Sequence, residues 1–135
     1  MEVAEEDDRL VVRLDPGEEV IGSLETLREE HGIENGFFFG IGAVDRATLG
    51  HYDVEEQDYL EETFEGEFEV TNFSGNIGPD KVHAHITLGK RDFTTVGGHC
   101  SSARVSGTFE IVVFRGDTPL DHVKDPETGL DVFDI

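Results

Sequence analysis

The fold is decided by residues 9–44, RLVVRLDPGEEVIGSLETLREEHGIENGFFFGIGAV. In Arg9–Leu14 leucine or valine recurs at every second position, which predicts a strand with one buried face. The segment Asp15–Glu18 has the pattern of a capping box, with Asp15 as the N-cap of a helix. The sequence therefore predicts that a strand leads directly into a helix.

The following residues predict one amphipathic helix. Apolar side chains share one helical face at these positions: Val20, Ile21, Leu24 and Leu27. Gly32 followed by Ile33 is typical of a Schellman stop, which ends a helix with a hydrophobic contact. We expect this helix to lie on a sheet.

From Gly36 onward the apolar period changes to two, with turn residues every eight to twelve positions. The predicted strands are Gly36–Val44, Ala47–Asp53, Tyr59–Phe64, Glu67–Phe73, Val82–Leu88 and Arg104–Phe114. A strand, a helix and then a run of strands favour an α+β fold, with a large, mostly antiparallel sheet of about seven strands and one main helix. The predicted domain is 9–115, between an acidic N-terminal tail, 1–8, and an acidic C-terminal extension, 116–135.

Composition limits the classes of function. The 10 Lys and Arg against 31 Asp and Glu give a formal charge of −21, which disfavours direct DNA binding without high salt or a partner. A solvated acidic surface of this kind suits a halophilic host. The single cysteine, the acidic N-terminus and the lack of a long apolar run predict a cytoplasmic protein with no signal peptide and no membrane span.

A histidine pattern offers the main candidate site. In Val82–Leu88, VHAHITL, the apolar positions alternate, so His83 and His85 share one strand face about 6.6 Å apart. A further histidine, His99, follows two glycines that permit a close backbone turn. Three histidines can hold Zn²⁺ or another divalent metal and leave a fourth position for water or substrate.

Purely structural interpretations of these residues remain open. The histidines alone are also compatible with half-buried sheet residues that only satisfy hydrogen bonds. Cys100 is either a soft metal ligand or a small buried hydrophobe. The remaining histidines have no partners nearby in the sequence and are expected at the surface: His31, His51 and His122.

Two charged residues are further candidates for catalysis. Glu110 alternates with apolar residues of its strand and is either a general base near the histidines or a solvent-facing glutamate. Arg46 either meets an anionic substrate or pairs with Asp45 or Asp53. The run Phe37–Phe39 is apolar on both strand faces, which predicts core or a subunit interface.

Residues 10–114 resemble the "plants and prokaryotes conserved" (PPC) domain, a family often described as predicted DNA-binding proteins. The matching stretches are RLDPGEEVIGSL (13–24), GIGAVDRATLGHYD (40–53), GEFEVTNFSGNIG (66–78), VHAHITL (82–88) and GGHCSSARVSGTFEI (97–111). Their order and spacing all agree with the family pattern.

The resemblance implies a homotrimer whose fold is related to that of acetolactate decarboxylase, in which three histidines hold zinc. The matching histidines of this chain are His83, His85 and His99. Plant members contact DNA through AT-hooks outside the domain, and this chain has no AT-hook.

Three hypotheses follow. The first is a trimer with a zinc-like site that binds or acts on a small anionic molecule. The second is a DNA-associated regulatory protein without enzymatic turnover, and the third is a structural module in which the histidines only satisfy hydrogen bonds.

Overall fold

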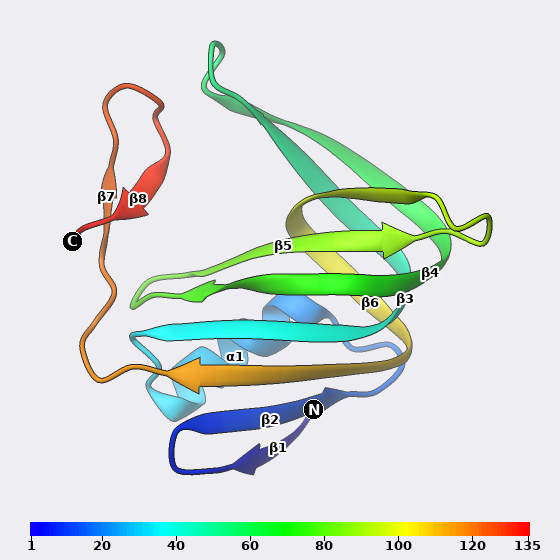
Figure 1. Cartoon of the computed structure of the whole chain (residues 1–135), viewed down its shortest axis with the longest axis horizontal. Coiled ribbons are helices and arrows are strands. Elements are labelled where there is room, and N and C mark those ends of the chain that lie inside the picture. The colour runs from blue at the N-terminus through cyan, green and yellow to red at the C-terminus, as the bar shows by residue number, and fades with distance from the viewer.

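The computed structural model describes residues 1–135. The type of each element follows the spacing of its apolar residues, which recur every two positions in the strands and every three or four positions in the helix. They are β1 (Glu2–Glu5), β2 (Arg9–Leu14), α1 (Val20–His31), β3 (Gly36–Asp53), β4 (Asp58–Ile77), β5 (Val82–Gly89), β6 (Thr95–Arg115), β7 (His122–Lys124) and β8 (Asp131–Phe133). Figure 1 shows them in chain order.

Six strands form one antiparallel sheet in the order β1-β2-β6-β3-β4-β5, and β5 also pairs with the beginning of β6. This extra pairing closes β3, β4, β5 and β6 on themselves at one end. The helix α1 lies against one face of the sheet, and β7 and β8 form a separate hairpin (Figure 1). The predicted α+β class with a mostly antiparallel sheet is confirmed. At 12 residues, the single helix is too short to cross a membrane.

Two pairs of predicted strands are continuous in the structure. The segments predicted as Gly36–Val44 and Ala47–Asp53 form the single strand β3, because a register shift between Val44 and Arg46 absorbs the extra residue as a bulge. The strand β4 likewise spans both of its predicted segments. The strands are therefore fewer in the main sheet and longer than predicted.

The helix begins later than the predicted capping box, so the prediction of Asp15 as its N-cap is wrong. The N-cap is Glu19, whose carboxylate accepts two backbone N–H groups of the first turn at 2.6 and 3.2 Å. Gly17 has φ +92°, outside the helical region, and its N–H donates to a β6 carbonyl at 2.8 Å. Residues 15–18 are thus a turn tied to the sheet. The C-terminus follows the prediction, with Gly32 at φ +58°.

The two chain ends are more ordered than expected. In the predicted loose tail 1–8, Glu2–Glu5 form β1, which pairs with β2. The predicted irregular extension 116–135 holds the short strands β7 and β8. The division into a domain 9–115 and two extensions stays a prediction.

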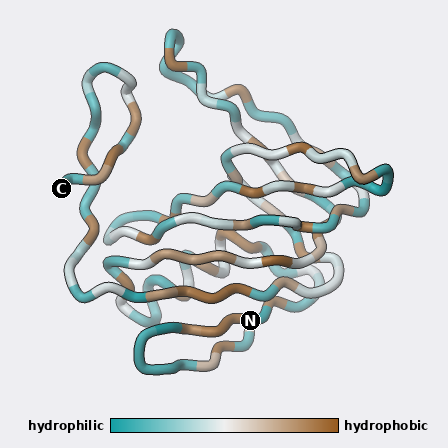
Figure 2. The backbone as a smooth tube through the Cα atoms, viewed as in Figure 1, coloured by the Kyte–Doolittle hydropathy of each residue, from teal (hydrophilic) through white to brown (hydrophobic).

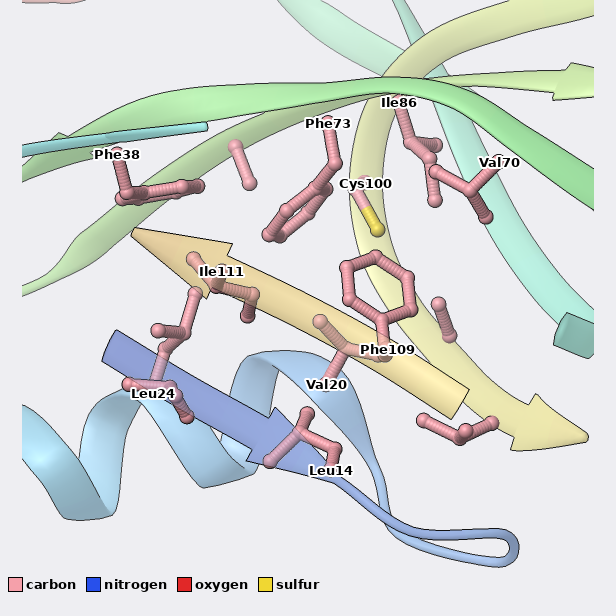
Figure 3. Close-up of a cluster of buried hydrophobic side chains, with 14 of the residues drawn as sticks. Leu14, Val20, Leu24, Phe38, Val70, Phe73, Ile86, Cys100, Phe109 and Ile111 are labelled. Atoms are coloured by element: carbon pink, nitrogen blue, oxygen red, sulfur yellow. The ribbon is translucent and has the colours of Figure 1, made fainter. Parts of the chain in front are cut away.

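The core contains 24 buried residues between the helix and the sheet. Leu24 of the helix faces the same cluster as Phe73 and Phe109 (Figure 3). The two Phe rings meet edge to face, with centroids 5.2 Å apart. Figure 2 shows hydrophobic and hydrophilic residues alternating along the strands above this core. Each large side chain buried here contributes roughly 1.5–3 kcal/mol, so the inner strand faces form a rigid base for the outer ones.

Candidate metal centre

The histidines meet where β5 pairs with β6. Within β5, Ala84 and Ile86 are buried in the core, so His83 and His85 project from the opposite face. His99 of β6 lies directly opposite His85 in the strand register. The sheet closure therefore joins the two motifs that the sequence keeps 14 positions apart.

The three imidazoles face one another. Their ring centroids are 5.1 to 5.9 Å apart, and one potential ligand atom from each lies within 4.8 Å of the other two. Nitrogens around a tetrahedral zinc are about 3.3 Å apart, so small side-chain rotations would bring these atoms to coordination distance.

The electrostatics of the cluster favour neutral imidazoles. Burial, followed by the positive charge that His99 and His85 would carry when protonated, lowers the pKa of His83 to about 4. Burial also lowers the pKa of His99, whose Nδ1 is covered and has no hydrogen-bond partner. Metal ligation requires neutral imidazole, and a covered nitrogen without a partner is costly unless something binds it. The donor set thus fits a divalent ion.

The two glycines before His99 allow the close strand contacts at this point. A Cβ at Gly97 would lie 2.9 Å from the Ile86 carbonyl oxygen, and one at Gly98 would lie 2.7 Å from the Gly50 carbonyl oxygen. Because backbone atoms cannot move aside as a flexible side chain can, larger residues here would push His99 away from β5. The sequence predicts a close backbone turn at these glycines, but both lie within the strand β6, where they permit close contact between strands instead.

Several residues beside the cluster have no signal in the sequence. A cavity of about 310 Å³ borders His83 and His99 and is also lined by Tyr59, Lys81 and Asp131. The Tyr59 ring packs on His99 with centroids 4.9 Å apart. These residues come from β4, the position just before β5 and β8, so only the folded chain brings them together.

The two charged catalytic candidates lie elsewhere. Glu110 is exposed on β6, opposite Arg13 of β2 and Ile41 of β3 in the register. Arg46 is exposed on β3 and lies 3.7 Å from Glu65. Neither lines the cavity beside the histidines, and a catalytic role for either stays a prediction.

The remaining histidines and the cysteine also have defined places. Cys100 points into the core (Figure 3), where burial raises the pKa of its thiol to about 12, so it behaves as a small hydrophobe. His51 is exposed as expected. His122 is not a free surface residue, because its Nδ1 is covered and its ring packs on Phe133 at 5.2 Å.

Sequence comparison relates the chain to part of a larger protein. It is 32% identical over 123 residues to the bifunctional protein GlmU of a Synechococcus species. The match covers 87% of this chain but 18% of that protein. The chain therefore spans about a fifth of the length of this relative.

Solved structures share the fold throughout. A candidate DNA-binding protein from Bacteroides thetaiotaomicron has a TM-score of 0.93 and 28% identity, covering 98% of this chain and 96% of that one. A metal-containing protein from Archaeoglobus fulgidus has a TM-score of 0.84 and 32% identity, covering 98% and 94%. A Staphylococcus aureus protein similar to alpha-acetolactate decarboxylase has a TM-score of 0.58 and 11% identity over 87% of this chain and 54% of that one, a likeness of fold alone.

The family model supplies the assignment that the fold and these similarities support. It matches residues 1–116, which include every strand of the main sheet and all three clustered histidines. The chain belongs to the Plants and Prokaryotes Conserved (PCC) domain family, abbreviated PPC above.

Proposed function

We propose that His83, His85 and His99 hold a divalent metal ion such as Zn²⁺, and that the adjoining cavity binds or transforms a small anionic molecule. The observation that carries this proposal is the convergence of three ligand atoms within 4.8 Å. The lowered pKa values of His83 and His99 keep both side chains ready to ligate at neutral pH. The metal-containing relative from Archaeoglobus fulgidus, at 32% identity, adds support.

The chain supplies orientation and access at this site. Tyr59 packs on His99 and limits the rotation of its ring. Three protein nitrogens leave room for a further ligand, and the cavity of about 310 Å³ gives that ligand a place beside the histidines. A bound divalent ion would supply Lewis-acid chemistry toward a group in this cavity. An anion suits such a centre because neutral histidines leave the charge of the ion uncompensated.

The proposed assembly is the homotrimer that the family resemblance implies. An apolar face of the sheet supports it: Phe39 is 55% exposed and Ile41 is 59% exposed on β3, with the partly exposed Phe114 on β6 beside them. The Phe39 and Phe114 rings lie 6.0 Å apart. Contiguous exposed aromatic and aliphatic side chains of this kind are typical of surfaces that a partner covers.

Metal analysis tests the proposal. Protein purified without a histidine tag and without chelator should contain close to one divalent ion per chain. The double variant His83→Ala, His99→Ala should lose it. Less than about 0.2 equivalents in the wild type, unchanged in the double variant, would refute the metal site.

The second candidate function is DNA association, favoured by relatives such as the candidate DNA-binding protein from Bacteroides thetaiotaomicron. The charge of −21 per chain would repel DNA at low salt, so contact would need a partner, a bridging cation or the salt-rich cytoplasm of a halophile. Titration of labelled duplex DNA at several salt concentrations separates the two functions. Tight binding at low salt that weakens steeply as salt rises would favour DNA association.

A further inference from the structure

The C-terminal segment His122–Phe133, here called the strap, lies against the cavity beside the histidines. The Tyr52 hydroxyl donates to the Thr128 carbonyl oxygen at 2.7 Å, which fastens the strap to the long β3–β4 hairpin. Phe133 at the other end packs on Phe37, with ring centroids 6.1 Å apart. Between these two points the strap contributes Gly129, Leu130 and Asp131 to the cavity lining. One wall of the cavity is therefore a segment outside the main sheet.

The strap also forms an ion pair with the one cationic side chain that lines the cavity. Lys81 precedes β5 and is the only lysine or arginine among the lining residues. Its Nζ lies 2.6 Å from an Asp131 carboxylate oxygen. The two side chains are 30% and 51% exposed, so water and small solutes reach the pair from outside. A carboxylate of the chain itself thus holds the position that the acid group of a bound ligand would take.

From this arrangement we infer that the cavity takes a small carboxylate whose acid group exchanges with the Asp131 carboxylate on Lys81, so that the part of the strap around Asp131 is released when the ligand binds. Lys81 is then the specificity residue for the acid group, and Asp131 is an internal competitor. The inference rests on the proposed function, because it names the ligand class of the same cavity.

Of the contacts that hold the strap, the Lys81–Asp131 ion pair is the one that a ligand carboxylate can replace. The Lys81–Asp131 pair is partly exposed, and such pairs are weak because water competes for both charges. The Gln57 side chain adds one long hydrogen bond to the Glu127 carbonyl oxygen at 3.4 Å. The family model ends at residue 116, before the strap, yet solved structures with the same fold cover 98% of this chain, so the shared fold takes in most of the strap.

The chain carries a built-in reporter for this exchange. It has no tryptophan and two tyrosines, and both tyrosines, Tyr52 and Tyr59, line the cavity. Release of the strap would break the hydrogen bond between Tyr52 and Thr128. Intrinsic tyrosine emission therefore reports on the strap and cavity alone.

The test is a titration of the full chain, zinc-loaded and metal-free, with glycolate and with its neutral amide, glycolamide, at constant ionic strength. Glycolate should change the tyrosine emission saturably and glycolamide should not. Asp131→Asn should tighten glycolate binding about threefold, because it removes the tethered competitor. Lys81→Met should weaken binding at least about tenfold, because the charged partner of the acid group is lost.

The matched control is Asp134→Asn, which makes the same change of charge three positions beyond Asp131, the last cavity-lining residue, and should bind as the wild type does. The inference fails if Asp131→Asn binds glycolate no tighter than Asp134→Asn, if Lys81→Met binds as the wild type does, or if no saturable response occurs. Zinc measured in the same samples keeps the two proposals apart. If the protein retains zinc but Asp131→Asn does not change glycolate binding, the inference about the strap is refuted and the metal site is not. If metal-free Asp131→Asn binds glycolate more tightly, the inference about the strap is supported even when no zinc is retained.

Discussion

The two ends of the β3–β6 strand pair differ in chemistry although the same two strands build both. At one end, His99 of β6 lies opposite Gly50 of β3, next to β5, and the strap lies against the adjoining cavity. At the other end, Phe114 lies opposite Phe37, and the neighbouring Phe39 side chain is half exposed. One end is completed by the chain itself, whereas at the other only Phe37 meets the strap, and Phe39 and Ile41 lack a cover in the single chain. The pair of strands can thus carry a ligand site and an assembly surface that respond to different substitutions.

The largest expected effect is at the histidine end. Zinc should raise the melting temperature of the wild type and should leave that of His83→Ala, His99→Ala unchanged, because a ligand stabilises only a native state that binds it. At a hundredfold excess over the dissociation constant, the gain is about 2.7 kcal/mol, or about 8 °C for a domain of this size. Differential scanning calorimetry with and without zinc measures it.

The matched control is His51→Ala, which removes an exposed histidine outside the cluster and should keep the full zinc-dependent rise. An equal rise in the double variant would show that zinc binds at the acidic surface instead of at the histidines.

A substitution at the apolar end should change the number of chains in the assembly. Ile41→Glu puts a second carboxylate opposite Glu110 on the exposed face of the sheet. It should convert a trimer of about 45 kDa to a single chain of about 15 kDa, because a partner would have to cover two adjacent like charges. Light scattering coupled to size exclusion gives the mass. Metal content per chain should not change if the two ends are independent.

The control is Leu60→Glu, which adds the same charge at a 73% exposed position on the distant part of β4. It should leave the mass unchanged. A wild type that runs as a single chain would refute the trimer, and a loss of metal in Ile41→Glu would show that the ends are coupled.

A smaller effect, on the pH dependence of stability, tests the burial of His83 without a bound metal. In metal-free protein the pKa of His83 is lowered to about 4, so the unfolded chain takes up a proton below pH 6.5 that the native state refuses. Stability from this side chain is present above pH 6.5 and is lost as the pH falls toward 4. Between pH 7 and 5 the free energy of unfolding of the wild type relative to His83→Gln should fall by about 1 kcal/mol, discounted because the side chain is only half-buried.

Urea unfolding of both proteins in chelator measures this difference, and the 31 acidic residues titrate in both and largely cancel. The interpretation is wrong if the difference between the two proteins is the same at both pH values.

The sequence predicts the parts of this fold that depend on local periodicity. The helix stripe, its stop at Gly32 and the alternation in β5 follow from neighbouring residues, so they are confirmed. The start of the helix is missed because Gly17 bonds to β6, a contact far along the chain. The continuity of β3 is missed because a bulge and a turn have the same local residues.

The candidate site shows the same limit. The histidine pair of β5 and the glycines before His99 are visible as motifs, and the family resemblance implies that the three histidines share one site. The pairing of β5 with β6 that brings them together has no signal in the sequence. Lys81 and Asp131 are 50 positions apart and have no pattern in common, so their contact appears only in the folded chain. Glu110 is the opposite case, since its alternation places it on a strand face correctly but does not say which end of the sheet that face serves.

The smallest expected effect concerns that residue. Glu110→Gln removes a charge from the exposed face of β6 without breaking any hydrogen bond or ion pair of the single chain, and exposed substitutions of this kind change the free energy of unfolding by less than about 0.5 kcal/mol. Zinc content and glycolate affinity should equal those of the wild type, because Glu110 does not line the cavity. Arg46→Gln serves as the parallel case on β3, where its partner Glu65 is also exposed. Loss of zinc or of glycolate binding in Glu110→Gln alone would restore its predicted role near the histidines and would mean that the two ends of the strand pair act as one site.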